Sequence, residues 1–496
     1  MQYLWNEGRR VINLNEFSHK QRIFLLLLWT LGILWLRPWT GDLRSDPLTY
    51  ACIAKDMVEN NHWFSPMLEG HPYFNKPPFY FWFVAVSFKL FGISFYASQI
   101  PSLLFATVDV LFFYWIVYRF FEDYDLAFFS AFALVTTRWI VRNFTSNRPE
   151  SLFLLSVLLG LYAVILMKEH NTKGPYLLGL SFAVGFLSKI FFAFFIPVFV
   201  LVFALDSKRL FAWLRWSHFY YGCLLGIILA VPFFLYYEAE NPGYIAHLIG
   251  KQTVQRITEG ADVNKDPFMY LKEIVRYYHP HLLFFILGIG ILWKKPKQET
   301  YYPIFLALIV LFIPLQLSTG KSDRYLTVIT PFLSMVTALG IVRYAKVKQF
   351  AKKITTYGVI PFFIFFWIVP VTVNPKKFSV LHLAEQLSKE GHIQYQDPLY
   401  IFKSQTTRPN KKIRFVEWTP AQAGQEYRLT YYFYLSDTFE HWENEKLSAW
   451  IHDGGEPVML LTATKHVQEL PLRGVQWVEI DSDKSHALFI GVTNRL

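Results

Sequence analysis

Charged residues are scarce in this chain. Asp, Glu, Lys and Arg make up 17% of its 496 residues, whereas a soluble protein usually carries about a quarter. Hydrophobic residues make up 53%, and they gather into runs long enough to cross a bilayer. This pattern excludes an ordinary soluble domain and predicts an α-helical protein that spans a membrane several times.

Cysteine is also rare. Cys52 and Cys223 are the only two, and they offer neither the spacing of a zinc site nor a disulfide framework. The first apolar run, Ile23 to Trp39, is not followed by a small-residue cleavage site. We therefore interpret it as a retained first span rather than a signal peptide. The chain has no internal repeat and no low-complexity segment.

The apolar segments predict about eleven transmembrane helices. They are 22–38, 97–119, 126–142, 150–167, 175–188, 190–206, 217–237, 279–293, 301–318, 325–343 and 356–373. The segment 79–92 is a twelfth candidate, and it decides on which side each later loop lies.

Basic residues in the loops resolve this choice. If 79–92 does not cross, the Lys- and Arg-rich loops all fall on the side of the basic N-terminus, as expected for the cytoplasmic face. The net charge of +11 is thus explained by membrane orientation, and nucleic-acid binding is not expected. A helix of 14 residues would also be only about 21 Å long, short of a ~30 Å hydrocarbon core. We therefore expect 79–92 to lie in the outer interface.

The composition changes near residue 374, where the last apolar segment gives way to a polar and mixed tail. We predict a transmembrane domain over 1–374, with a large outer loop at 39–96, and a small soluble α/β domain over 375–496. Predicted strands of the tail are 398–402, 429–435, 457–461, 475–480 and 487–492, and predicted helices are 382–390 and 438–452. The same topology places this tail outside.

Ionisable and tyrosine side chains gather on the outer side. The candidates for a functional site are Asp46, Tyr73, Lys76, Arg148, Glu150, Lys189, Arg256, Lys321, Arg324 and Tyr325. Ionisable groups at a membrane face are functional candidates. Each also has a structural alternative: a basic residue can anchor a helix end, Glu150 can cap a helix, and Tyr73 can belong to an aromatic belt.

One reaction suits this mixture of side chains. A sugar carried on a lipid phosphate has a good leaving group, and its transfer requires cations that hold the phosphate and stabilise its developing charge. A carboxylate can accept the proton of an acceptor hydroxyl. Lys76, Lys189 and Arg256 are candidates for the phosphate, and Asp46 or Glu150 for the carboxylate.

Five ordered motifs resemble a known family. They are SDPLTYACIAKDM…HPYFNKPPFYFW in the first outer loop, NRPESL, GFLSKIFFAFFIP, NPGYIAHLIGKQTVQRI and STGKSDRYLTVITP. Together they resemble the GT-C glycosyltransferases that use lipid-linked sugars, specifically the group of aminoarabinose (lipid A) transferases and protein O-mannosyltransferases. This family also has short interfacial helices in its first outer loop, and a C-terminal periplasmic domain is usual in it.

The resemblance implies roles for single residues. Asp46 matches the catalytic Asp of the family and Glu150 its second acidic position. Lys76 and Arg256 match the groups that bind the carrier phosphate. Tyr73, Lys189 and Tyr325 match side chains that line the same cavity.

The chain also departs from the family pattern. Pro47 replaces an acidic residue that follows the catalytic Asp in the family, the position of Asp46. Ile190-Phe191 replace the Gly-Pro that follows the motif lysine, the position of Lys189. Asn75 and Thr253 stand where the aminoarabinose enzymes have an acidic and a histidine metal ligand. No metal site or other cofactor is therefore expected.

The resemblance predicts a glycosyltransferase that uses a polyprenyl (undecaprenyl) phosphate sugar. We expect a multi-pass protein of a bacterial inner membrane, with a cytoplasmic N-terminus and a periplasmic C-terminal domain. The acceptor would be lipid A, another envelope glycolipid, a protein or a glycan, and the sequence leaves this open. A transporter or flippase, and a membrane-anchored binding protein whose tail is the active part, are alternatives from other classes.

Overall fold

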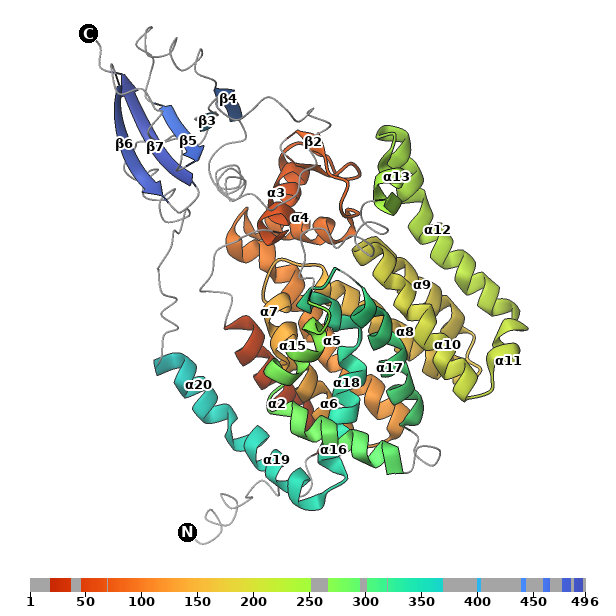
Figure 1. Cartoon of the computed structure of the whole chain (residues 1–496). Helices are drawn as coiled ribbons and strands as arrows, with labels where there is room; N and C mark the ends of the chain where they lie inside the picture. The colour runs from red at the N-terminus through yellow and green to blue at the C-terminus, as the bar shows by residue number, and fades with distance from the viewer. Residues whose placement is uncertain are drawn as a thin grey trace, which may run out of the picture.

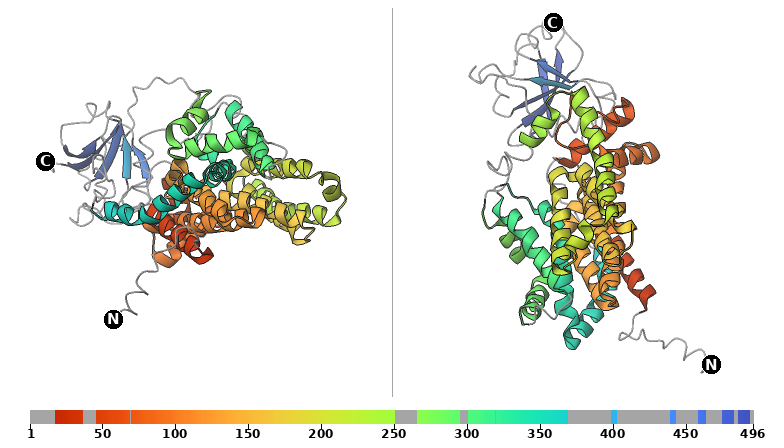
Figure 2. Two further views of the ribbon diagram at one scale, coloured as in Figure 1. Left: turned by 90° about the horizontal axis from the view of Figure 1, so that it is seen from below. Right: turned by 90° about the vertical axis from the view of Figure 1, so that its right-hand side faces the viewer.

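The fold is that of a computed structural model, which describes residues 18–36, 46–68, 70–250, 266–294, 301–318 and 320–368. It also describes five strands between residues 399 and 493. Most of the described chain is helical, and the helices form an elongated bundle (Figures 1 and 2).

The first half of the chain forms one side of the bundle and part of its upper end. Its elements are α2 (His19–Thr30), the π-helix η1 (Leu31–Trp35), α3 (Asp46–Glu59), β1 (Met67–Leu68), β2 (His71–Pro72), α4 (Phe79–Phe91), α5 (Phe95–Phe121), α6 (Tyr124–Thr136), α7 (Arg138–Phe144), α8 (Glu150–Lys168), α9 (Lys173–Lys189), the 3-10 helix η3 (Ile190–Phe194) and α10 (Phe195–Asp206).

The second half adds the remaining helices. They are α11 (Leu210–Leu214), α12 (Ser217–Glu240), α13 (Tyr244–Ile249), α15 (Met269–Tyr277), α16 (His281–Lys294), α17 (Tyr302–Leu317), the 3-10 helix η5 (Asp323–Val328), α18 (Thr330–Val342), α19 (Ala345–Tyr357) and α20 (Val359–Ile368). A large buried cluster of aliphatic and aromatic side chains joins α2, α5–α8, α10 and α15–α18.

Local signals fix where several helices begin. Ser18 and Gln21 form a capping box at the start of α2. The side chain of Ser94 accepts a hydrogen bond from the Ala97 amide at the start of α5, and Asp123 caps α6. These caps satisfy amide groups that have no partner within the helix itself.

The helices α8, α9 and α10 run in alternating directions. A short turn joins α8 to α9, and Ile190, with a φ of +50°, ends α9. A Cβ placed at Gly160 of α8 would meet Phe199 Cζ at 2.9 Å and Ile196 Cγ2 at 3.0 Å, so α10 returns beside α8. The predicted turn between segments 175–188 and 190–206 is therefore present. The start of α8 and the end of α9 consequently lie at the same end of the bundle.

The described residues of the predicted first outer loop form a separate layer at that end. Helices α3 and α4 pack on each other and enclose a second buried cluster that includes Tyr50, Tyr73, Tyr80 and Phe81. Figure 1 shows α3, α4 and β2 above the long helices, near α13. The segment predicted to lie in the interface is thus a short helix, Phe79–Phe91, ended by Gly92 at a φ of +81°.

Several helices have the length and composition of membrane spans. In the described part of the chain, four apolar helical stretches are long enough by length and composition. They are Phe95–Phe121, Glu150–Lys168, Lys173–Asp206, which contains both α9 and α10, and Ser217–Glu240. Two bent helix pairs raise the number to six if each pair is one span. Shorter apolar helices are Phe79–Phe91, Tyr302–Leu317 and Thr330–Val342. The expectation that the chain crosses the membrane about eleven times therefore stays a prediction.

One predicted span differs in shape. The segment 126–142 was predicted as one span, and in the structure it consists of two helices, α6 and α7, which meet at Thr137 with a bend of 62°. Thr137 has extended backbone angles and its amide bonds to the Leu134 carbonyl, which ends the regular helix. The bend brings α7 beside η5 and α8.

The strands of the tail form one mixed sheet. They are β3 (Leu399–Phe402), β4 (Phe439–Trp442), β5 (Val458–Ala463), β6 (Val475–Ser482) and β7 (His486–Thr493), in the order β4-β3-β5-β7-β6. β3 is parallel to β4 and β5, whereas β7 is antiparallel to β5 and β6. The prediction of a helix over 438–452 is wrong at residues 439–442, where an aromatic-rich stretch pairs as β4. The predicted strand 429–435 and helix 382–390 lie outside the described residues.

Candidate functional site

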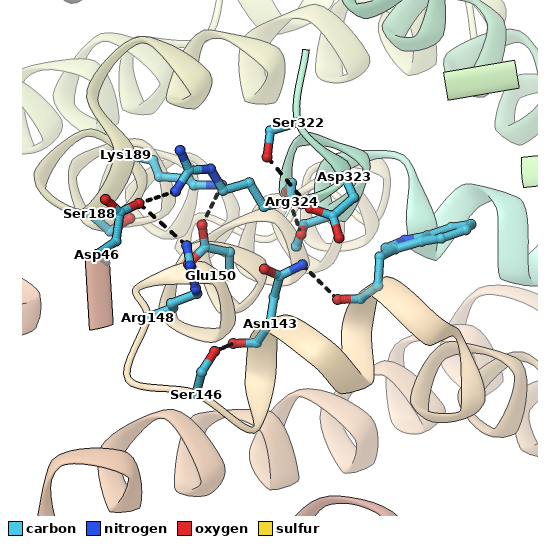
Figure 3. Close-up of polar contacts among 12 residues, drawn as sticks. Asp46, Asn143, Ser146, Arg148, Glu150, Ser188, Lys189, Ser322, Asp323 and Arg324 are labelled. Atoms are coloured by element: carbon cyan, nitrogen blue, oxygen red, sulfur yellow. Dashed lines mark hydrogen bonds and ion pairs between the residues drawn. The ribbon is translucent and has the colours of Figure 1, made fainter. Parts of the chain in front are cut away.

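Asp46 is held by two arginines that are distant in the sequence. It is the first residue of α3, and its carboxylate accepts from the guanidinium of Arg324 in η5. Arg148, which precedes α8, places its Nη1 3.4 Å from the same oxygen, Oδ2. Figure 3 shows both arginines approaching Asp46 from different elements. Three segments of the chain therefore converge on this carboxylate.

These arginines change the acidity of Asp46. Burial on its own would raise the pKa of the carboxyl, but the positive charges of Arg324 and Arg148, together with the hydrogen bond from Arg324, outweigh it. They lower the pKa from 3.8 to about 2. Asp46 is thus ionised at neutral pH and, in this arrangement, a weak base.

A second ion pair lies deeper. Lys189, the last residue of α9, places Nζ 3.2 Å from Oε1 of Glu150, the first residue of α8. The side chains are only 3% and 2% exposed. The antiparallel packing of α8 and α9 brings these two helix ends together, and each charge complements the dipole of its own helix.

Aromatic rings surround the lysine of this pair. Its Nζ lies 5.2 to 5.5 Å from the ring centroids of Phe153, Phe192 and Tyr325. Such rings favour a cation over their faces. The other oxygen of Glu150, Oε2, is buried with no hydrogen-bond partner among the described residues.

The first outer loop adds Lys76 and Tyr73. Lys76 is half-buried just before α4, and its charge contributes to the lowered pKa of Asp46. Tyr73 is 8% exposed, and its ring packs edge-on against Phe81 at a centroid distance of 6.0 Å. Its carbonyl accepts from the hydroxyl of Tyr237, which ties the loop to α12.

The other predicted residues fall into two groups. Tyr325 joins the site, with its ring 4.5 Å from that of Phe192. Lys321 is buried, but its ammonium donates to the carbonyl of Ser318, and the contacts described here do not join it to Asp46. Arg256 and Thr253 lie outside the described residues.

The sequence interpretation missed Asn147 as a structural link of this site. Its amide donates to the Pro47 carbonyl at 2.9 Å, and its Oδ1 accepts from the Tyr80 hydroxyl at 2.9 Å. It therefore holds the start of α3, the helix α4 and the start of α8 together. Its place next to Arg148 in the NRPESL motif was the only signal in the sequence.

His247 was missed too. It belongs to α13, and its Nε2 lies 3.3 Å from Oδ1 of Asn75. A histidine of the NPGYIAHLIGKQTVQRI motif therefore contacts Asn75, the residue before Lys76. The sequence had predicted Thr253 at the position of the family's histidine ligand. In the described part of the chain, no group of three or more His, Cys, Asp or Glu side chains could hold a metal ion.

The balance of charge favours an anionic ligand. Lys76, Arg148, Lys189 and Arg324 are four cations around the two carboxylates of Asp46 and Glu150. Among the residues that the structure describes, the cations around Asp46 and Glu150 outnumber these two carboxylates. A phosphate group has the charge and the acceptor oxygens that such a site would bind.

The chain is similar to known proteins over part of its length. Residues 75–236 match the family described as dolichyl-phosphate-mannose-protein mannosyltransferase. Two undecaprenyl phosphate-alpha-4-amino-4-deoxy-L-arabinose arabinosyl transferases are also similar. The one from Pseudomonas fluorescens is 26% identical over 61% of this chain and 56% of its own length. The one from Aeromonas hydrophila is 27% identical over 63% and 59%.

The fold is shared with a solved structure as well. ArnT from Cupriavidus metallidurans bound to undecaprenyl phosphate superposes with a TM-score of 0.67 at 14% identity, over 94% of this chain and 96% of that one. The archaeal oligosaccharyltransferase AglB from Archaeoglobus fulgidus gives a TM-score of 0.51 at 12% identity, over 90% of this chain and 69% of that one.

This chain is similar in sequence to the aminoarabinose transferases and to the mannosyltransferase family, and it shares its fold with ArnT. The matched segments span a little over half the length of the curated relatives. The shared fold confirms the predicted fold class, a polytopic helical membrane protein. The matched residues 75–236 include Lys76, Arg148, Glu150 and Lys189 of the site.

Proposed function

We propose that this protein is a glycosyltransferase that moves a sugar from a polyprenyl phosphate carrier to an acceptor at the outer face of a bacterial inner membrane. The observation that carries the proposal is the net positive cluster around Asp46, which lies at one end of a GT-C bundle. The similarity to arabinosyl transferases that use undecaprenyl phosphate supports the same class of donor.

In the proposed reaction, the carrier phosphate binds the cations of the cluster. Lys76 and Arg256 would bind it directly, as the family motifs imply. Arg148 and Arg324 contact Asp46, and their guanidinium groups would move from its carboxylate to the phosphate oxygens. The acceptor oxygen attacks the anomeric carbon, and the bond from this carbon to the phosphate oxygen breaks. The phosphate leaves with the electron pair, and its new charge is stabilised by the same cations.

Asp46 would then serve the acceptor. Paired with two arginines, it is too weak a base to take a proton from a hydroxyl efficiently. When phosphate oxygens attract the arginines, the pKa of Asp46 rises and the carboxylate can accept the proton of the acceptor. Glu150 supports this arrangement by holding Lys189 among the aromatic rings.

The acceptor is the open part of this proposal. Lipid A is favoured, because the similar curated proteins are aminoarabinose transferases. A protein or another glycan is the second candidate, favoured by the family match over residues 75–236. The domain of residues 375–496 is proposed to lie on the same outer side and to contact the acceptor.

Reconstituted vesicles would test the proposal. The wild-type protein is incubated with a polyprenyl-phosphate sugar and extracted envelope lipids, and the products are identified by mass spectrometry. We expect D46N and K76A each to lower transfer at least about 100-fold, as for loss of one group that stabilises transition-state charge. R119A removes an exposed ion pair with Glu169 instead, and it should keep full activity. Full transfer by D46N and K76A would refute the proposal.

A further inference from the structure

Helix α19 has two chemically different faces. Lys348, Lys352 and Thr355, spaced as i, i+4 and i+7, lie on one face, which is half-buried or buried. Lys346 and Lys353 lie on the opposite face and are exposed. On a helix these spacings separate the two sets by about half a turn. The exposed lysines are thus not needed for packing.

The inward face of α19 contacts the carboxylate of Asp125 and the indole of Trp29. Asp125, at the start of α6, pairs through Oδ2 with Lys352 at 2.9 Å and with Lys348 at 3.4 Å. Its Oδ1 pairs with Arg22 of α2 at 2.6 Å. At the other end of α19, the indole of Trp29 donates to the Thr355 carbonyl at 2.8 Å. These contacts determine which side of α19 faces away from the bundle.

The outward face combines positive charge with large apolar side chains. Phe350, Ile354 and Tyr357 are 61%, 49% and 53% exposed, and they lie beside Lys346 and Lys353. A basic face next to exposed aromatic and aliphatic side chains is typical of helices that lie in the membrane interface. Exposed apolar side chains of this size would be unfavourable in water.

The position of α19 fits such an interface. It follows the apolar helix α18 and precedes the apolar helix α20, so the chain turns along it between two hydrophobic segments. Figures 1 and 2 show it at the end of the bundle opposite to α3 and α4, and therefore far from Asp46.

We infer that the outward face of α19 binds phospholipids whose headgroups carry a net negative charge. Lys346 and Lys353 contact the headgroup phosphates, and Phe350, Ile354 and Tyr357 insert among the first acyl carbons. Charge complementarity and the exposed apolar side chains both favour a lipid over a free anion, which would leave the apolar side chains in water. This surface is independent of the site around Asp46.

Nanodiscs of defined composition provide the test. The full-length protein is reconstituted in discs of phosphatidylcholine with a limiting fraction of phosphatidylglycerol, and the retained lipids are counted by native mass spectrometry. We compare the wild type with K346Q/K353Q. The matched control K173Q/K208Q removes two exposed lysines, one at the start of α9 and one just after α10. The unfolding temperature of each variant shows that it is folded.

We expect K346Q/K353Q to lose its preference for phosphatidylglycerol by about 30-fold, because each of the two lysines contributes about 1 kcal/mol near an anionic surface. The control should keep the preference, and high salt should reduce it in the wild type. An unchanged preference in K346Q/K353Q would overturn the inference. So would an equal loss in both double variants, or complete displacement of the lipid by inorganic phosphate.

Discussion

Arg324 pairs with Asp46, although 278 residues of sequence separate them, and this contact joins η5 to the start of α3. Arg148 approaches the same oxygen of Asp46 but lies farther away, at 3.4 Å. The two arginines should therefore contribute unequally. The closer guanidinium, that of Arg324, holds the carboxylate, and that of Arg148 mainly adds charge.

This inequality can be measured with alanine variants. We expect R324A to lower transfer at least about tenfold more than R148A, because the hydrogen bond that it removes is the shorter and stronger of the two. R142A is a suitable control, since Arg142 makes an exposed pair with Asp323 at 3.0 Å beside the site, and exposed pairs contribute little. Initial rates at saturating acceptor give the comparison. Equal losses in all three variants would contradict this assignment.

The buried ion pair of Glu150 and Lys189 should affect the free energy of unfolding. Either E150Q or K189M leaves one buried charge without its partner, and each should lower the free energy of unfolding by about 3–5 kcal/mol. The double variant E150Q/K189M should regain most of this loss, because no lone charge remains. Thermal unfolding in one detergent gives all four values. Strictly additive losses would show that the two side chains do not act as a pair.

Transfer by the double variant separates structure from function. If the pair also orients the site around Tyr325 and Phe192, E150Q/K189M stays well below wild-type activity although it is folded. Wild-type activity in this variant would assign the pair a structural role alone.

The pKa of Asp46 predicts a dependence of stability on pH. The native pKa of about 2 lies below the ordinary value of 3.8, so ionised Asp46 stabilises the fold by about 2 kcal/mol at neutral pH. This stabilisation is fully present above about pH 4 and is lost as the pH falls through about 2. The wild type should therefore unfold at a higher temperature than D46N at pH 7, and the difference should shrink toward pH 2. A constant difference over this range would contradict the pairing.

Chelation should leave transfer unchanged. Asn75 and His247 meet through a hydrogen bond, and an amide at this place is a poorer metal ligand than a carboxylate. The rate measured before and after treatment with EDTA, followed by Zn²⁺ or Mg²⁺, tests this expectation. A loss that one of these ions restores would show that the protein uses a metal.

Removal of the tail tests where the active part lies. A chain ending at residue 374 should still transfer the sugar to a small acceptor, because the described residues of the site all precede it. Its activity toward the natural acceptor can fall. Complete loss with both acceptors, in a protein that remains folded, would support the alternative in which residues 375–496 are the active part.

The sequence by itself determined the class of the protein and most of the candidate residues. Long apolar runs cannot be buried in a small soluble core, so they require a bilayer and predict helices. The ends of the apolar segments then predicted most helix limits within a few residues. The motifs also named Asp46, Lys76, Glu150, Lys189 and Arg324 before any distance was known.

Only the tertiary structure decided which of these residues meet. Arg324 could have been an anchor at a helix end, but η5 carries it to Asp46, while Lys321, three residues earlier, turns to the Ser318 carbonyl. Asn147 and His247 became visible only through their partners. The physical reason is that such contacts depend on how the helices pack. Packing brings together residues that are far apart in the sequence, and their separation along the chain does not predict which of them become neighbours.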